Sequence, residues 1–455
     1  MAARLREGFT TGSAATGAAL AALHLLRAGC APGHVDVPLP PFSSGSSTPS
    51  GPRDVAADVA ADAAADAAVD AVATDGANDA ASERGDFPTP RGWLRLEVAV
   101  CGHGPAPELA AWPEFAPLFA EGGSCGHAVG AGHSAHPRVA HASIRKDGGD
   151  DPDATSGALI TATVVENFAM AGHTGVANAA TGTDAAHSPA VSIEGGPGVG
   201  RVTLPGLPVP VGEAAVNPTP RQQIAFAMRH GALVFGAGPC PPLRVIVSVP
   251  EGERLARQTF NPRLGIVGGI SILGTQGTVR PYSHQAWKAT IEQGLAVAAA
   301  TGCRDMGLTT GRRSERLLMD KYPHMPQRSF IQVADFAAFS LKAAGGMPFD
   351  NLIWGCFFGK LVKLAQGHAY THARHAELDM EDLARLCRQC GASCADQVRH
   401  CVTAAHALEL LLQDKAGNDV IALTGQKAAA VAANFAGRHV RLHLFHTNGR
   451  ELLAL

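Results

Sequence analysis

The segment 258–283, QTFNPRLGIVGGISILGTQGTVRPYS, combines residue types and spacing that suggest a ligand site. Five glycines lie among its apolar residues, and a predicted helix follows it. Glycine has no Cβ and tolerates positive φ, so this segment would let the backbone approach a ligand closely. A strand, a glycine loop and a helix in this order build nucleotide pockets in α/β domains. We therefore predict a cofactor site here, with tight packing as the alternative role of the glycines. The predicted cofactor-binding residues are Gly268, Gly269, Gly274, Thr275 and Gly277.

Three carboxylates and one histidine are the candidates for polar chemistry beside that loop. Asp150 and Asp151 lie in a Gly/Pro turn, where a carboxylate pair could act as a general base or only shape the turn. His372 in THARH could transfer a proton or contact a substrate carboxylate, against a structural role. Glu315, beyond LTTGRRS, could accept hydrogen bonds from the ribose of a cofactor. A solvated glutamate at the start of a helix is the alternative for Glu315.

Two lysines are candidates for binding an anionic substrate. Lys360 and Lys363 are spaced i,i+3, which places them on one face of a predicted helix. Gly359 precedes them at the predicted start of that helix, where anions bind. We predict that both lysines contact substrate, with surface lysines as the alternative.

Two arginines and two threonines complete the predicted substrate-binding set. Arg221 in NPTPR and Arg263 in NPRLG could pair with carboxylates. Bracing of a turn is the alternative for both arginines. Thr10 and Thr11 could donate hydrogen bonds to substrate, or they could cap a helix.

Periodic patterns predict the elements that position these residues. Thr11 or Ser13 can begin a helix that runs to about residue 27, and Gly29 can end it. Ser283 can cap a second helix that runs to about residue 300. From about 245 to 370 strand and helix patterns alternate, which predicts a mostly parallel sheet with flanking helices. A closing hairpin is predicted around Asn448-Gly449.

The chain is predicted to be an α/β plus α+β protein. Residues 1–38 and 91–250 would form an N-terminal α+β domain, and residues 251–455 a C-terminal α/β domain with the mostly parallel sheet. Residues 39–90 are predicted to be a low-complexity insertion that starts as a Pro/Ser/Gly loop. Within it, aspartates recur every fourth residue from Asp54 to Asp70, which indicates a solvated segment. A surface for a metal or a basic partner is the alternative.

Composition argues against several classes of function. The chain has 455 residues and a net charge of −3, so no basic surface indicates a nucleic acid or an anionic membrane. The N-terminal apolar run is interrupted by Gly12, Thr16 and Gly17, so we interpret it as a folded helix rather than a signal peptide. Without a long apolar run or a dense disulfide pattern, the predicted location is the cytoplasm.

A group of cysteines near the C-terminus is the main candidate for a metal site. Cys387, Cys390 and Cys394 are followed by His400 and Cys401, which would be enough ligands for zinc. The same segment also fits a pair of helices in which cysteines are small buried residues. We predict that the protein itself binds no metal.

Several segments together resemble one family, the cobalt-precorrin-5B C-1-methyltransferases of anaerobic cobalamin biosynthesis. The string TFNPRLGIVGGISILGT is long and specific, and the other matching segments lie in the family's order from near the N-terminus to beyond residue 377. These segments are REGFTTGSAATGAA (6–19), KDGGDDPDATSGALI (146–160), VNPTPRQQI (216–224), GKLVKLAQG (359–367) and THARHAE (371–377).

The resemblance implies transfer of a methyl group from S-adenosylmethionine to carbon 1 of a cobalt-bearing tetrapyrrole, giving cobalt-precorrin-6A. Cobalt would then belong to the substrate and not to a protein site. Such a transfer needs the reacting carbon and the methyl group to be held in line, and it needs no nucleophile from the protein. The expected partner is cobalt-precorrin-5B, with direct contact to neighbouring enzymes of the pathway as a further option. The sequence indicates no oligomeric state.

The chain departs from the family pattern at a few places. Ala14 stands where members commonly have cysteine, so no essential thiol resides there. Cys356 and Phe357 replace a usual Gly-His pair, and Ala334 and Asp335 replace a usual Ser-Asn pair. Glu377 stands where aspartate is expected. These changes concern the predicted C-terminal part of the site.

Two other functions are compatible with parts of the sequence. One is a non-catalytic carrier of tetrapyrrole intermediates, which would bind the macrocycle without needing S-adenosylmethionine. The other is a different nucleotide-using enzyme, against which the absence of a P-loop lysine and of a GxGxxG motif argues. Cofactor binding and turnover distinguish the methyltransferase from the carrier.

Overall fold

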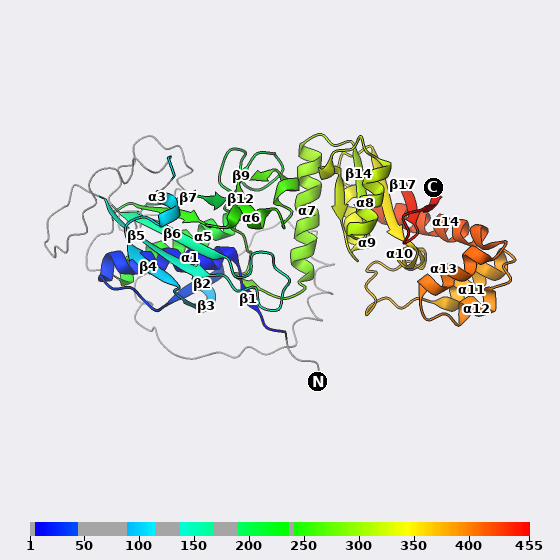
Figure 1. Ribbon diagram of the computed structural model, residues 1–455, viewed down its shortest axis with the longest axis horizontal. Helices are drawn as coiled ribbons and strands as arrows, with labels where there is room; N and C mark the ends of the chain where they lie inside the picture. The colour runs from blue at the N-terminus through cyan, green and yellow to red at the C-terminus, as the bar shows by residue number, and fades with distance from the viewer. Residues whose placement is uncertain (1–4, 44–88, 111, 114–136, 167–189, 236–240) are drawn as a thin grey trace.

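The computed structural model describes residues 5–43, 89–110, 112–113, 137–166, 190–235 and 241–455. The described chain is mixed α/β, which confirms the class expected from the sequence, and it forms two lobes on either side of helix α7 (Figure 1). The helices of the first lobe and the connecting helix are α1 (Thr11–Ala28), α3 (Pro107–Ala110), α5 (Pro218–Val234), α6 (Gly252–Ala256) and α7 (His284–Ala300), with the 3-10 helix η1 (Asn261–Leu264).

The first lobe is built on a five-stranded sheet with the order β4-β5-β6-β10-β7. Its strands are β4 (Val100–His103), β5 (Arg138–Arg145), β6 (Leu159–Glu166), β7 (Val191–Gly195) and β10 (Leu243–Ser248). The β10–β7 pair is parallel and the others are antiparallel. Helices α1 and α5 pack together, and α1 also packs on β5 and β6.

Helix α1 follows from the small residues of its sequence. Thr10 caps it by accepting a hydrogen bond from Ser13 N at 3.1 Å, so the cap lies one residue before Thr11. Gly29, with φ of 75°, ends the helix as predicted. Because alanine and glycine dominate, nearly the whole helix is buried between the sheet and α5. This fixes the position of Thr10 and Thr11 at its start.

Short strand pairs extend the first lobe. They join β1 (Gly8–Phe9) to β13 (Thr278–Val279), β11 (Ile266–Val267) to β9 (Arg201–Val202), β12 (Gly269–Ile270) to β8 (Gly198–Val199), and β2 (His34–Ser43) to β3 (Thr89–Glu97). The last pair shows that the predicted Pro/Ser/Gly loop was wrong at its start, since strand β2 continues to Ser43. The predicted insertion 39–90 otherwise lies, over 44–88, outside the described residues.

The second lobe contains a sheet with the order β15-β14-β16-β17-β18. Its strands are β14 (Asp305–Thr309), β15 (Phe330–Gln332), β16 (Asn351–Phe357), β17 (Val440–Phe445) and β18 (Glu451–Ala454). The pairs β14–β15, β14–β16 and β16–β17 are parallel, whereas β18 closes the predicted C-terminal hairpin as an antiparallel edge. Alternating strands and helices produce this topology because a parallel pair needs a long crossover.

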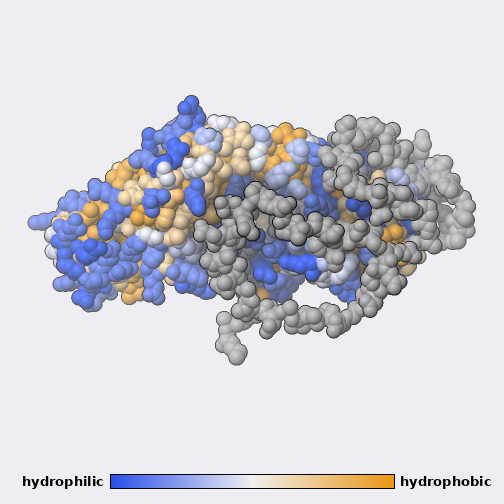
Figure 2. Space-filling model, turned by 180° about the vertical axis from the view of Figure 1, so that it is seen from behind, coloured by the Kyte–Doolittle hydropathy of each residue, from blue (hydrophilic) through white to orange (hydrophobic). Residues whose placement is uncertain are grey.

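The helices of the second lobe cover both faces of its sheet and continue beyond one end of it. They are α8 (Arg312–Lys321), η2 (Gln327–Ser329), α9 (Ala337–Gly345), α10 (Phe358–Ala365), α11 (Met380–Gln389), α12 (Ala395–Arg399), α13 (Ala404–Gln413) and α14 (Gly417–Ala436). Helices α9, α10, α13 and α14 contribute to one large core with β14, β16 and β17. From behind, the end of the molecule that carries α11 to α13 is mainly hydrophilic (Figure 2).

The two large hydrophobic cores divide differently from the predicted domains. Leu255, Ala256, Ile270 and Ile272 belong to the core of the first lobe, although the sequence assigned residues from 251 onwards to the second domain. The core of the second lobe begins at Ile291 in α7. The glycine-rich segment therefore packs with the N-terminal lobe.

Candidate active site

The glycine segment and the N-terminal motif form one structural unit. Strands β1 and β13 pair with Gly8 opposite Val279. Gly277 O accepts hydrogen bonds from Thr10 N at 3.0 Å and from Ser13 Oγ at 2.8 Å. Thr11 Oγ1 accepts from Leu273 N at 2.9 Å. Two motifs some 260 residues apart in the sequence thus meet at the start of α1, and they fix each other.

Packing accounts for three of the predicted cofactor-binding glycines. A Cβ on Gly269 would lie 2.1 Å from Gly198 O, because β12 and β8 approach closely there. A Cβ on Gly274 would lie 2.5 Å from the Thr10 side chain, and one on Gly277 would lie 2.5 Å from Leu39. The presence of glycine at these three positions is therefore explained by packing and is not evidence for a cofactor there. A bulky residue at Gly269 would disturb the fold.

Two members of the predicted cofactor set are not explained in this way. Gly268 has a φ of 84°, and a Cβ there would meet open space. Thr275 is exposed. Both remain free to contact a ligand.

The carboxylate pair is held by backbone groups of the same unit. Asp150 accepts a hydrogen bond from Arg6 N at 2.6 Å, and Asp150 N donates to Arg6 O at 2.9 Å. Asp151 Oδ1 accepts from Tyr282 N at 2.9 Å. The hydrogen bond from the Arg6 side chain lowers the pKa of neighbouring Asp147. The turn alternative thus has direct structural support, and Asp151 connects the turn to the start of α7.

A second group of predicted residues lies beyond the carboxyl ends of β15 and β16. Lys360 Nζ forms an ion pair with Asp335 and donates to Thr371 O at 3.1 Å. Lys363 Nζ donates to the same Thr371 O at 3.0 Å. Asp335 and Thr371 were not predicted as site residues. The replaced Ser-Asn pair, which includes Asp335, was the one signal that pointed to this place.

We define the lysine cluster as Asp335, Lys360, Lys363 and Thr371. It is partly buried and contains more positive than negative charge. Lys363 is only 7% exposed. Burial lowers the pKa of Lys363, and the charge of Lys360 lowers it further, while Asp335 opposes both effects. The cluster contains two lysine ammonium groups and one carboxylate, that of Asp335, which pairs with Lys360. It therefore has an excess of positive charge that suits an anionic group of a ligand.

Aromatic rings border the lysine cluster. The rings of Tyr370 and His372 are stacked at 6.0 Å with an interplanar angle of 15°, and Tyr370 lies 5.0 Å from the ring of Phe336. Burial and the charge of Asp335 raise the pKa of Tyr370. His372 follows Thr371, whose carbonyl oxygen accepts hydrogen bonds from Lys360 and Lys363, and its ring belongs to this aromatic group.

The start of α7 connects the two groups of predicted residues. Ser283 caps α7 by accepting from Ala286 N at 3.3 Å, as the sequence predicted. One residue before the cap, Tyr282 N contacts Asp151; one residue after it, His284 Nε2 lies 3.1 Å from Tyr370 OH. The N-terminal unit and the aromatic rings beside the lysine cluster thus converge on residues 282–284.

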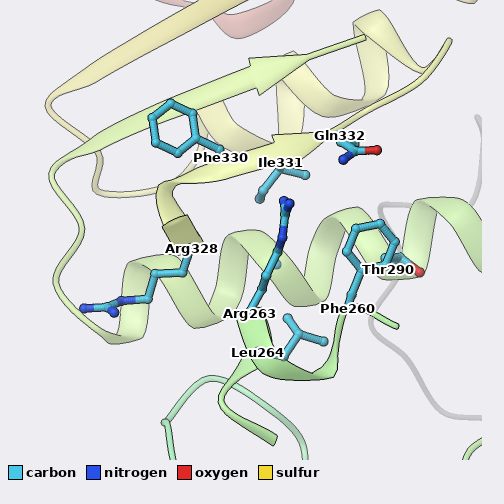
Figure 3. Close-up of a pocket in the computed structure, with 9 residues that line it drawn as sticks. Phe260, Arg263, Leu264, Thr290, Arg328, Phe330, Ile331 and Gln332 are labelled. Carbon is cyan, nitrogen blue, oxygen red and sulfur yellow. The ribbon is translucent and has the colours of Figure 1, made fainter. Parts of the chain in front are cut away.

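Arg263 and Glu315 lie apart from both groups and pair with each other. Arg263 Nη1 and Nη2 donate to the two carboxylate oxygens of Glu315 at 2.5 and 2.9 Å, and Gln332 Nε2 donates at 2.7 Å. Arg263 projects from η1 towards β15, beside a cavity of about 30 Å³ (Figure 3). A ribose or a substrate carboxylate would have to displace this buried pair.

Arg221 also uses its donors within the protein. Its Nε donates to Val216 O at 2.9 Å and its Nη1 to Ile193 O at 3.0 Å, with Glu213 at 3.4 Å from Nη2. Burial lowers the pKa of Arg221, and the charge of Glu213 partly offsets this effect. These contacts match the alternative role of bracing the chain that enters α5.

Other features of the described residues contribute no further site. A cavity of about 170 Å³ is lined by Gly302 to Asp305, at the amino end of β14 and so at the opposite edge of the sheet. Within the described ranges, no group of three or more His, Cys, Asp or Glu side chains is arranged to hold a metal ion. Cys387, Cys390 and Cys394 belong to, or pack against, the core of the second lobe. Among the described helices, none is long and apolar enough to cross a membrane.

Comparisons with known proteins agree with the family resemblance. The CbiD family matches residues 122–281, and the C-terminal domain of CbiD matches residues 370–454. A cobalt-precorrin-5B C(1)-methyltransferase of Nitratidesulfovibrio vulgaris is 53% identical over 315 residues, which cover 68% of this chain and 76% of the relative. One of Geobacillus kaustophilus is 43% identical over 318 residues, covering 69% of this chain and 80% of the relative.

A solved structure of a cobalamin biosynthesis protein (cbiD) from Archaeoglobus fulgidus is 22% identical and covers 78% of each chain, with a TM-score of 0.29. The sequence relatives carry the assignment. The chain belongs to the CbiD family.

Proposed function

We propose that this protein transfers a methyl group from S-adenosylmethionine to carbon 1 of cobalt-precorrin-5B in cobalamin biosynthesis, giving cobalt-precorrin-6A. The observation that carries the proposal is the 53% identity to a relative of that name over 315 residues. The methyl donor is inferred from the reaction, since an electron-rich ring carbon would attack the electrophilic methyl group of a sulfonium, with the neutral thioether as the leaving group. We expect the reaction to take place in the cytoplasm.

The domain arrangement that accompanies this function is also a proposal. We propose an N-terminal α+β domain and a C-terminal α/β domain, with the first extended from residue 250 to the start of α7. Its support is the membership of Ile270 and Ile272 in the first core. The two domains would then meet along α7, where the predicted site residues converge.

We place the cofactor at the carboxyl edge of the second sheet. In open α/β sheets, ligands bind outside the carboxyl ends of the strands, at the point where the strand order reverses. In the order β15-β14-β16-β17 that point lies between β14 and β16. The residues that follow these strands are Thr310 and Gly311 after β14, and Gly359 and Lys360 after β16. Thr310, Gly311 and Gly359 would border the cofactor, with Lys360 beside them facing the substrate. Gly268 and Thr275 stay candidates for ligand contact from the first lobe.

The donor chemistry at this edge fits the cofactor. S-adenosylmethionine, when bound, supplies an electrophilic methyl group and carries one carboxylate. The lysine cluster offers ammonium donors with excess positive charge, which suit the carboxylate of the cofactor or one of the many carboxylates of a corrinoid precursor. The switch point and the cluster lie at the same edge of the sheet because α10 begins directly after β16 and Lys360 lies in its first turn.

We place the macrocycle between this edge and the N-terminal unit. Residues 282–284 contact Asp151 on one side and Tyr370 on the other, so a ligand there would touch both lobes. The protein's contribution is to hold the reacting carbon in line with the methyl group, and orientation alone supplies much of the acceleration of such a step. His372, beside Tyr370, is the proposed group for taking up a proton that the macrocycle releases as it is methylated. Asp150 and Asp151 orient the loop around the substrate.

Measuring product in a single turnover separates this function from that of a carrier. Anaerobic protein is mixed with an equal amount of cobalt-precorrin-5B and excess S-adenosylmethionine, and S-adenosylhomocysteine is quantified by mass spectrometry. A methyltransferase forms one S-adenosylhomocysteine for each macrocycle. A carrier binds the macrocycle and leaves S-adenosylmethionine intact, which would overturn the proposal.

A further inference from the structure

Two non-glycine residues in the described part of the chain have a positive φ, and both flank the proposed site. Tyr282 has a φ of 59° and Ala334 a φ of 49°. Such a backbone is unfavourable for a bulky side chain and persists only where the surroundings impose it, often at ligand sites. Tyr282 precedes α7 in the first lobe, and Ala334 follows β15 beside the lysine cluster.

Each of the two strained residues lies close in sequence to an aromatic ring at the same junction between the lobes. His284 lies two residues after Tyr282, and Phe336 two residues after Ala334; the rings of His284 and Phe336 are 5.3 Å apart. Tyr282 and Ala334, the two residues with positive φ, thus each lie two residues before one partner of a ring contact between the lobes. Strain at both sides of one contact indicates that this junction is shaped for a ligand rather than for packing alone.

The side chain of Tyr282 has no packing role that would explain this strain. It is 68% exposed, the most exposed of the large aromatic residues in the described chain. Its backbone N–H is fixed by Asp151 Oδ1 at 2.9 Å. The carboxylate therefore holds the backbone in the conformation that presents the ring to solvent.

Other exposed apolar residues lie on the same segment. Leu273 is 48% exposed, with its backbone N–H bound by Thr11, and Trp287 in the first turns of α7 is 39% exposed. Three large apolar side chains are therefore exposed within fifteen residues. The same segment contacts Tyr370, which borders the lysine cluster, through His284. This combination suits a flat, conjugated ligand that carries carboxylates at its rim.

We propose that Tyr282 stacks on the face of the tetrapyrrole macrocycle. The inference rests on the proposed function and names a residue that positions the substrate. Leu273 and Trp287 extend the apolar surface, while Lys360 and Lys363 reach the carboxylates at the rim. Asp151 acts through Tyr282 and is a positioning residue.

Replacing Tyr282 by glycine tests the stacking role without a loss of fold, since glycine tolerates positive φ. Binding of cobalt-precorrin-5B is titrated anaerobically by its visible absorption, and binding of S-adenosylmethionine is measured separately by calorimetry. We expect Tyr282→Gly to raise the Kd for the macrocycle about tenfold, which corresponds to about 1.4 kcal/mol. The Tm should stay the same or rise, and the Kd for S-adenosylmethionine should not change.

Two control variants complete the test. Tyr282→Phe retains the ring and should keep the Kd within about twofold, and Trp93→Ala removes another exposed aromatic, 50% exposed on β3, without effect. An unchanged Kd in Tyr282→Gly, with wild-type protein binding and methylating normally, would overturn the stacking role alone. Failure of the wild-type protein to bind the macrocycle would overturn the proposed function and this inference together.

Discussion

Arg263 and Glu315 form a bidentate ion pair between η1 in the first lobe and α8 in the second, at 2.5 and 2.9 Å. Glu315 is buried, and Gln332 satisfies it further. The sequence had assigned Arg263 to substrate and Glu315 to the ribose of a cofactor. The ion pair occupies both side chains and joins the two lobes.

Breaking this pair should destabilise the protein. In Glu315→Gln the guanidinium of Arg263 loses its counter-charge in a largely buried place, at a cost of about 3 kcal/mol. Urea unfolding measures the change in the free energy of unfolding. Glu253→Gln removes one member of the exposed Arg257–Glu253 pair and should change it little. Equal effects of the two variants would contradict a buried, stabilising pair.

The free energy of unfolding should fall as the pH is lowered through the range in which the His443 imidazole titrates. This side chain is buried, with Tyr322 OH 2.8 Å from Nε2 and Glu451 2.6 Å from Nδ1. Burial lowers the pKa of His443 below the usual 6.5, although Glu451 opposes the shift. Below pH 6.5 the unfolded chain therefore binds a proton that the folded chain does not, so stability is lost as pH falls from there towards the lower folded pKa.

The variant His443→Gln isolates this effect from other groups. Urea unfolding between pH 5 and 7.5 should show a shallower pH dependence in the variant than in the wild-type protein. Carboxylates titrate in both proteins, and so does His230, because burial lowers the pKa of His230 in both. Identical slopes would show that His443 titrates alike in the folded and unfolded chains.

Lys360 should matter for the catalytic efficiency with cobalt-precorrin-5B. In Lys360→Met the ion pair to Asp335 and the bond to Thr371 are lost, and the excess of positive charge disappears. We expect kcat/KM for cobalt-precorrin-5B to fall by about 10- to 100-fold, because a charged hydrogen bond contributes roughly 1.5–3 kcal/mol. Steady-state kinetics give the value. Lys342→Met, at an exposed position of α9, is the matched control and should retain activity.

The predicted insertion should be dispensable for catalysis. Ser43 at the end of β2 and Thr89 at the start of β3 are partners in one antiparallel pair, so a short link can connect them. Deleting residues 45–85 should leave the rate of methyl transfer nearly unchanged, as a turnover assay would measure. A large loss of activity with intact folding would assign a function to that segment.

Local signals in the sequence predicted the elements well where short-range chemistry decides them. Gly29 ends α1, Ser283 caps α7, and the alternation of strands and helices corresponds to the parallel pairs of β14, β15 and β16. Each depends on neighbours in the chain, such as a hydroxyl three residues before an N–H. The family string further identified the chain's relatives.

Contacts between distant residues explain what the sequence could not predict. Position 269 must be glycine because the backbone of Gly198 lies too close for a side chain. Glu315 is ion-paired with Arg263, which is 52 residues away in the sequence. Glycine and arginine occur both in ligand sites and in packed junctions between lobes. Residue type and spacing alone therefore could not distinguish a ligand-binding role from a structural one. Asp335 was overlooked as a site residue because its partner, Lys360, approaches only when β15 and β16 join the same sheet.

The most direct test of the central claim locates the transferred methyl group. The protein is incubated anaerobically with cobalt-precorrin-5B and S-adenosylmethionine that carries a ¹³C-methyl group, and the product is examined by NMR; Lys342→Met and Lys360→Met are run in parallel. We predict label on ring carbon 1 with the wild-type protein and Lys342→Met, and much less product with Lys360→Met. Tight binding of the macrocycle without any label on carbon 1, beside an active relative as positive control, would contradict the account.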